Sequence, residues 1–309
     1  MRFLVHADDY GFSDGMNRAI ASCLETKCID GAAIMAGGLK DGLVRSLSTM
    51  PPRHGVPALG VHLSLFETRP ISLPEQIPLL TAPDGTFRHS LGSLTRALVV
   101  PGSDRDHLLD QIRQEWTAQI DWVLTRVPET ASALYLDGHQ HVHCLPGLRP
   151  VLSALLERYP IRYVRVPSEH WHRSPGPLRL QVLGSARRGI LRYWSRGLRE
   201  FLAVRGVRTP DAFIGAFAST CLTYDRVSAA LRSLHTSIAQ SDALVEIMVH
   251  PDALPPETGP RPYAAADRNT EYAMLCSSQF QTLISRGTGG NESPDPPVET
   301  SPRPPKGQP

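Results

Sequence analysis

Short apolar runs and segments with helical periodicity alternate along the chain. Runs typical of buried strands occupy seven stretches, at 3–7, 31–35, 58–63, 133–137, 163–166, 213–216 and 243–250. Between and after them, apolar residues recur at intervals of three and four, most clearly from Leu108 to Val123. This alternation predicts a parallel sheet. About seven strand–helix units favour a distorted α/β barrel, similar to a TIM barrel, over an open sheet.

Local signals indicate where several elements begin and end. Ser13 is placed to cap a helix whose buried face includes Met16 and Ile20. We also expect a loop at 8–12, a short helix at 39–47, mostly irregular chain at 66–105, a helix after residue 146 and a last helix at about 270–285.

Composition narrows the class of protein. With 309 residues, 41% of them hydrophobic, the chain is long enough to bury a large core. The near balance of 32 Lys and Arg against 30 Asp and Glu gives no support for a nucleic-acid partner. No apolar run reaches the roughly 18 residues of a transmembrane segment. The five scattered cysteines form no CxxC motif, which indicates reduced thiols and a cytoplasmic protein.

Two segments depart from the average composition. Residues 287–309 are rich in proline and glycine and lack aromatic residues, so we expect a disordered tail after a single domain at 1–286. Between Trp171 and Arg199 there are seven arginines and no acidic residue. This segment, 173–199, is interpreted either as a solvated helix face or as a docking surface for an anionic or membrane-associated substrate.

The acidic pair Asp8-Asp9 directly follows the first strand-like run. Two adjacent carboxylates there repel each other unless a cation, or a proton held for chemistry, lies between them. The carboxyl ends of parallel strands gather at one face, where active sites are built. The pair therefore indicates a metal site beside a catalytic carboxylate. The alternative is a helix N-cap next to a solvated acid.

Histidines follow two later strand-like runs. His62 ends one of them, and residues 137–143 read Asp-Gly-His-Gln-His-Val-His, which places His139, His141 and His143 at alternate positions. Imidazoles and carboxylates are common ligands of divalent metals. The alternatives are a hydrogen-bonded core histidine at 62 and a surface loop at 137–143. Cys144 beside this loop is interpreted as a neutral spectator rather than a ligand or nucleophile.

Two more titratable residues lie at strand ends. Arg165, in Tyr-Val-Arg-Val-Pro, is placed to orient an active-site carboxylate, although a structural ion pair is the simpler interpretation. His250, in Met-Val-His-Pro, closes the last strand-like run and is a candidate acid or base. Five of the seven predicted strands thus end in a titratable group, which is hard to explain as five independent coincidences.

Taken together, these motifs resemble the YdjC-type carbohydrate deacetylases, which include chitooligosaccharide deacetylases and hopanoid-associated deacetylases. The resemblance rests on four stretches in the order of the chain: Ala7–Gly11, Gly60–Leu63, Asp137–His143 and Met248–Pro251. It covers about residues 1–286. Tyr10 is a mild departure, because the family usually has phenylalanine there.

The resemblance implies a distorted barrel and one divalent metal held by Asp9, His62 and His139. It implies hydrolysis of N-acetyl groups on amino sugars, with Asp8 as the base and His250 as the acid. The family suggests Mg²⁺, whereas the softness of the ligand set suits Zn²⁺. The substrate would be an acetylated amino sugar, free or lipid-linked, and a homodimer is compatible with the resemblance.

The other two histidines of the 137–143 motif and the tyrosine after the acidic pair are expected to assist the site rather than to bind the metal. His141, His143 and Tyr10 are expected to contact substrate, and the two histidines are alternatively expected to orient the ligands from behind. Two rival functions stay open at this point. One is a metal-dependent hydrolase of another bond, such as a phosphoester, and the other is a non-catalytic sugar-binding protein.

Overall fold

The computed structural model describes residues 1–38, 50–99, 103–169, 178–216, 222–238, 242–252 and 265–285. The helix expected at 39–47 and the tail expected at 287–309 lie outside these ranges, as does the start of the arginine-rich segment. Within the described ranges, no helix combines the length and the apolar composition needed to cross a membrane.

Seven strands form one sheet in which every neighbouring pair is parallel. They are β1 (Arg2–Tyr10), β2 (Gly31–Ile34), β3 (Leu59–Leu63), β4 (Leu134–Gly138), β5 (Ile161–Val164), β6 (Ala212–Ile214) and β7 (Leu244–Val249). Their order across the sheet is β5-β4-β3-β2-β1-β7-β6. The sheet curls so that its two edge strands approach each other: the Val164 N–H on β5 donates to the Arg208 carbonyl just before β6, at 3.0 Å. The predicted barrel-like fold is confirmed.

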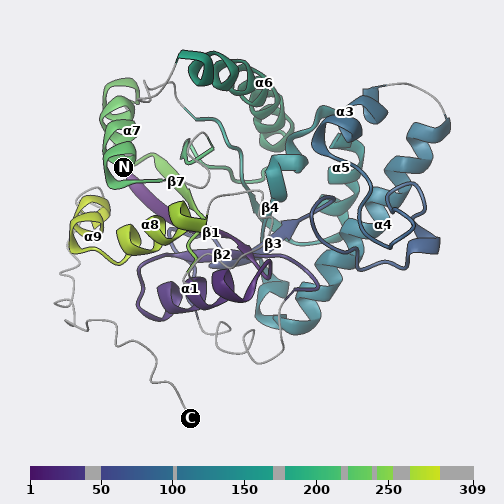
Figure 1. The fold of residues 1–309 in the computed structure, drawn as a ribbon, viewed down its shortest axis with the longest axis horizontal. Helices are drawn as coiled ribbons and strands as arrows, with labels where there is room; N and C mark the ends of the chain where they lie inside the picture. Colours follow the sequence, from purple (N-terminus) through teal and green to yellow (C-terminus); the bar gives the residue numbers. More distant parts are fainter. Residues whose placement is uncertain are drawn as a thin grey trace, which may run out of the picture.

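Eight helices are described around the sheet. They are α1 (Asp14–Glu25), α3 (Leu91–Val99), α4 (Ser103–Arg126), α5 (Arg149–Arg158), α6 (Leu178–Ala203), α7 (Tyr224–Ser237), α8 (Ala265–Leu275) and α9 (Ser278–Ser285). Short 3-10 helices are η1 (Pro74–Gln76), η2 (Pro128–Ser132), η3 (His139–Cys144) and η4 (Pro146–Leu148). In Figure 1, α1, α7, α8 and α9 cover one flank, α3, α4 and α5 the other, and α6 crosses the top.

Helix α1 begins where the sequence predicted. The Ser13 hydroxyl accepts a hydrogen bond from the Met16 N–H at 3.3 Å, which satisfies one free donor of the first turn. Met16 and Ile20 are fully buried against the sheet, so the predicted face is confirmed.

Three sequence-based expectations were wrong. Strand β1 continues through the residues expected to form a loop at 8–12, as far as Tyr10. Helix α3 lies in a region expected to be irregular, because the two residues that it buries, Leu94 and Leu98, give too short a periodic signal. The last helix is interrupted between α8 and α9, where the Ser277 hydroxyl accepts from the Phe280 N–H and starts a new helix. Helix α7 was also not foreseen.

The inner face of the barrel changes from apolar to charged along the strands. Strands β1, β2, β4, β5 and β7 contribute to one small apolar cluster, which includes Tyr135 and Leu244 close to the amino ends of β4 and β7. Side chains of a strand alternate between its two faces, so the same inner face continues two residues later with Asp137 and Glu246. Both carboxylates are fully buried. Charged groups therefore collect at the carboxyl end of the barrel.

Gly60 allows β3 and β4 to approach closely beside this charged region. A Cβ at position 60 would lie 2.7 Å from the Tyr135 carbonyl oxygen and 2.1 Å from its ring. We therefore expect Gly60→Ala to lower the free energy of unfolding by about 1–3 kcal/mol, as overpacking does. Denaturant unfolding measures this. Gly189→Ala on α6 is the control, since nothing lies within 4 Å, and it should not destabilise. Equal stability of Gly60→Ala and wild type would contradict the prediction.

Candidate metal centre

The acidic pair lies at the end of β1, where the backbone is irregular. Asp9 has φ of 63°, a left-handed conformation that is uncommon outside glycine, and the pairing of β1 with β2 shifts between Ala7 and Tyr10. In a regular strand, adjacent side chains point to opposite faces. The irregularity brings both carboxylates into one buried region, because Asp8 contacts Arg165 while Asp9 contacts His139.

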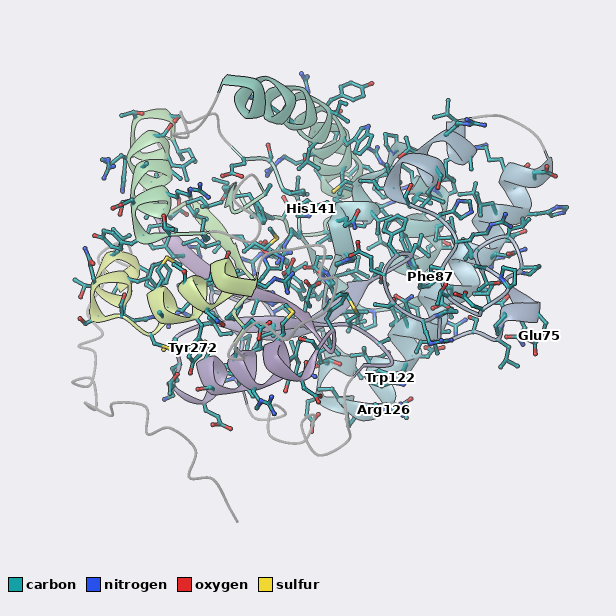
Figure 2. The ribbon with its side chains drawn as sticks, viewed as in Figure 1. Glu75, Phe87, Trp122, Arg126, His141 and Tyr272 are labelled. Atoms are coloured by element: carbon teal, nitrogen blue, oxygen red, sulfur yellow. The ribbon has the colours of Figure 1, made fainter. Side chains whose placement is uncertain are left out.

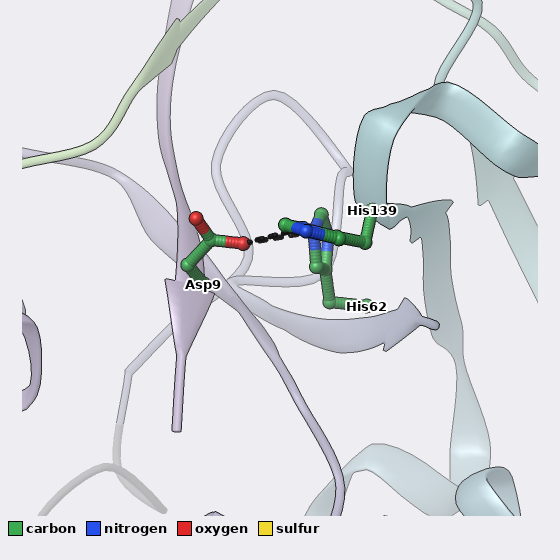
Figure 3. A group of neighbouring side chains, drawn as sticks. All are labelled: Asp9, His62 and His139. Atoms are coloured by element: carbon green, nitrogen blue, oxygen red, sulfur yellow. Dashed lines mark hydrogen bonds and ion pairs between the residues drawn. The ribbon is translucent and has the colours of Figure 1, made fainter. Parts of the chain in front are cut away.

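Asp9, His62 and His139 gather into one cluster, although they lie far apart in the sequence. Asp9 Oδ1 is 2.9 Å from His139 Nδ1 and 3.3 Å from His62 Nε2. The three ligand atoms all lie within 4.8 Å of one another, and all three residues are buried. Figure 3 shows the two imidazoles, from η3 and β3, directed at the same carboxylate oxygen at the end of β1. Oxygen and nitrogen donors in this number are suited to a divalent cation with open positions.

Each imidazole of the cluster also contacts a second carboxylate through its other nitrogen. His62 Nδ1 is 2.7 Å from Asp137 Oδ1, and His139 Nε2 is 2.9 Å from Glu67 Oε2. Metal-binding histidines commonly donate their second N–H to a carboxylate in this way. The contacts leave His62 Nε2 and His139 Nδ1 facing Asp9.

The electrostatics of the cluster favour a positive charge between the three residues. Burial alone would lower the pKa of His62, but the carboxylates of Asp137 and Asp8 outweigh it and hold the pKa well above its ordinary value. Burial also opposes protonation of His139, yet Asp9 and Glu67 raise its pKa to about 9. Carboxylates that stabilise protons on the imidazoles would equally stabilise a metal cation that replaces those protons. The residues present therefore fit a divalent metal.

Arg165 is fully buried and binds three carboxylates. Its Nη1 lies 2.5 Å from Asp8 Oδ2 and 2.6 Å from Asp137 Oδ2, and its Nε donates to Glu246 Oε1 at 2.6 Å. The hydroxyl of Tyr135 also donates to Glu246, at 2.8 Å. Buried ions need such pairing, because each is costly to remove from water. The guanidinium thereby holds the carboxylate of Asp8 in one orientation.

A second group of potential ligands consists of His6, Asp8 and Asp137. Both of its carboxylates are already bound by the Arg165 guanidinium. The His6 ring stacks on Tyr135, with centroids 4.1 Å apart, and burial lowers the pKa of His6 to about 3. A positive charge therefore already occupies this group, and the cluster around Asp9 is the better cation site.

Asp8 and His250 face each other beside the cluster. Asp8 Oδ1 is buried without a hydrogen-bond partner, whereas its Oδ2 binds Arg165. Burial raises the pKa of Asp8 to about 7, with Asp137 adding to the effect and Arg165 opposing it. His250 Nε2 lies 3.9 Å from Asp8 Oδ2, and burial lowers the pKa of His250 to about 3. His250 is therefore neutral near pH 7, not the imidazolium expected of a resting acid.

The residues expected to contact substrate lie in three different environments. Tyr10 is fully buried in the hydrophobic core, and His143 is fully buried with Nε2 2.9 Å from the Arg165 carbonyl oxygen. These positions argue against direct contact with substrate; His143 supports the segment that carries Arg165. His141 is partly exposed and packs edge-on against Phe213, with centroids 6.0 Å apart. Figure 2 shows His141 near the middle of the molecule, below α6.

Several residues of the site received no role from the sequence. Glu246 carried a readable signal, because a charge within the run Leu244–Val249 of a buried strand requires a partner. Asp137 belonged to the histidine motif without a role of its own. Nothing in the sequence marked Glu67, or Arg268, whose Nη2 lies 3.7 Å from Asp9 Oδ2.

The chain is similar to known proteins over most of its length. The model of the YdjC-like protein family matches residues 2–286. A carbohydrate deacetylase from Homo sapiens is 30% identical over 275 residues, covering 84% of this chain and 78% of the relative. A carbohydrate deacetylase from Brevibacillus brevis is 23% identical over 287 residues, covering 92% of this chain and 94% of the relative.

A solved structure supports the fold. It comes from Enterococcus faecalis, is provisionally described as a cellobiose-phosphate cleavage protein, and covers 93% of this chain and 94% of its own, with a TM-score of 0.63 and 19% identity. The family match spans the strands, the acidic pair and all the histidines of the site. The chain belongs to the YdjC-like protein family.

Proposed function

We propose that this protein is a metal-dependent carbohydrate deacetylase that removes N-acetyl groups from an amino sugar. The observation that carries the proposal is the gathering of Asp9, His62 and His139 around one point, with the free Oδ1 of Asp8 beside it. The family membership and the names of the curated relatives support the same reaction class.

The three clustered residues would hold the cation, which supplies the Lewis acidity for attack of water on an amide carbonyl. Asp9 contributes the carboxylate, and the two imidazoles contribute their nitrogens nearest to it. Both imidazoles have their far nitrogen held by a carboxylate, so their rings are oriented before substrate binds.

Asp8 would act as the general base, because Oδ1 is free to accept a proton while Arg165 holds Oδ2. His250 would return a proton to the leaving amine. Because it is neutral at rest, it must first receive a proton, and Asp8 lies 3.9 Å from its Nε2. The backbone N–H of His250 donates to Glu271 Oε2 at 2.6 Å, which fixes the start of this segment.

The proposal predicts metal-dependent release of acetate. Purified protein should release acetate from N-acetylglucosamine oligomers or acetylated glycolipids, lose this activity after chelation and dialysis, and regain it with Zn²⁺ or Mg²⁺. Comparing the two ions identifies the better metal. Phosphate release from sugar phosphates is measured in parallel. Phosphate release without acetate release, or acetate release unaffected by chelation, would contradict the proposal.

A further inference from the structure

We propose that Glu67 is a positioning residue that holds His139 in the tautomer and orientation needed for metal binding. The inference rests on the proposed function, since it concerns the same metal site. Glu67 lies in the loop after β3, in Leu-Phe-Glu-Thr-Arg-Pro, outside the motifs that carry the chemistry.

The geometry determines which nitrogen of His139 carries its proton. Nε2 lies 2.9 Å from Glu67 Oε2, and Nδ1 lies 2.9 Å from Asp9 Oδ1. An ionised carboxylate can only accept a hydrogen bond. When Asp9 binds the metal, Glu67 remains the acceptor for the single N–H of the neutral ring. Nδ1 then presents its lone pair to the metal.

The two histidine ligands use opposite tautomers. His62 directs Nδ1 at Asp137 and Nε2 at Asp9, whereas His139 directs Nε2 at Glu67 and Nδ1 at Asp9. Asp137 is fully buried, but the Glu67 side chain is 31% exposed. Glu67 can therefore be replaced without leaving a buried charge unpaired, which makes its role testable in a folded variant.

The backbone on both sides of this contact is unusual. Glu67 has φ of 58°, and Gln140 and His141, which directly follow His139, have φ of 51° and 57°. Residues other than glycine adopt this left-handed region at a cost, and such residues concentrate at functional sites. The Phe12 ring stacks on His139, with centroids 6.1 Å apart and planes 24° apart. Phe12 and Glu67 together restrict the rotation of the ring.

The test is a calorimetric titration of metal-free protein with Zn²⁺. Glu67→Ala should bind the metal about 10–100-fold more weakly than wild type, the usual effect of removing such a carboxylate. Glu67→Gln should lose less affinity, because its amide oxygen still accepts from Nε2. Glu67→Gly relaxes the left-handed backbone and should nevertheless lose as much affinity as Glu67→Ala.

Two controls separate positioning from other roles. Glu75→Gln removes an exposed carboxylate on η1, at the far edge of the molecule in Figure 2, and should leave metal affinity unchanged. Thermal unfolding in chelator should be the same for wild type and Glu67→Gln, which shows that the fold is intact. At saturating metal, the KM of Glu67→Gln should stay close to that of wild type, because a positioning residue does not contact substrate.

The outcomes distinguish this inference from the proposed function. Wild type that binds no metal would refute the metal-dependent function itself. Wild type that binds metal, with every Glu67 variant binding equally well, would refute the positioning role alone. An increased KM at saturating metal with unchanged metal affinity would also refute it, because Glu67 would then contact substrate.

Discussion

Asp8→Asn should lower turnover by about 10²–10⁴-fold while the protein still binds its metal, the range expected for loss of a general base. An asparagine oxygen can still accept the hydrogen bond from Arg165 Nη1, so the orientation of the side chain is retained. Its amide cannot take a proton from water at Oδ1, the atom without a partner. Acetate release and metal content, measured on the same preparation, test this.

The neighbouring Asp9→Asn should behave differently. Asp9 faces both imidazoles of the cluster, so its loss should remove metal binding and turnover together. His62→Ala should resemble Asp9→Asn rather than Asp8→Asn. If Asp8→Asn loses its metal, or if His62→Ala remains active, the division of labour between base and ligands is wrong.

Arg165→Met should lower the free energy of unfolding by roughly 3–5 kcal/mol, the cost of breaking a buried ion pair from one side. The change leaves Asp8, Asp137 and Glu246 close together and buried without their cation. Denaturant unfolding followed by circular dichroism measures the loss. The matched control is Arg196→Met on α6, where the side chain is 82% exposed and pairs with Glu200 one helical turn away. Such exposed pairs contribute only about 0.3–0.5 kcal/mol.

The destabilisation of Arg165→Met should depend on pH. Without the guanidinium, the three buried carboxylates hold protons more tightly in the folded than in the unfolded protein. Folding then binds protons, so the stability of the variant relative to wild type should fall as pH rises. A deficit at pH 8 that is no larger than the deficit at pH 5 would contradict this account.

The predicted strands illustrate why the fold could be read from the sequence. A buried parallel strand is a short, nearly continuous apolar run, and a covering helix is a run with period 3.6. Both patterns are local. The predicted ends of β1, β3 and β7 therefore lie within one residue of the observed ends, except that β1 continues as far as Tyr10. Helix α3 was missed because it buries only Leu94 and Leu98, too few to establish a period.

The candidate site could be predicted in part for the same reason. Parallel strands bring their carboxyl ends to one face, so Asp9, His62 and His139 could be expected to meet once each was placed at a strand end. The structure brings their ligand atoms within 4.8 Å of one another. The sequence could not show that Asp9 adopts a positive φ within β1, which turns the two adjacent carboxylates into the same region.

The sequence alone determined the alternation of strands and helices, the barrel-like fold and the edge at which the chemistry gathers. Only the tertiary structure decided which carboxylates support the site: Asp137 behind His62, Glu67 behind His139, and Glu246 behind Arg165. The physical reason is the separation along the chain over which each kind of interaction acts. Hydrophobic periodicity acts between near neighbours in the chain, whereas a hydrogen bond between residues 72 or 81 positions apart depends on strand register and individual backbone torsions.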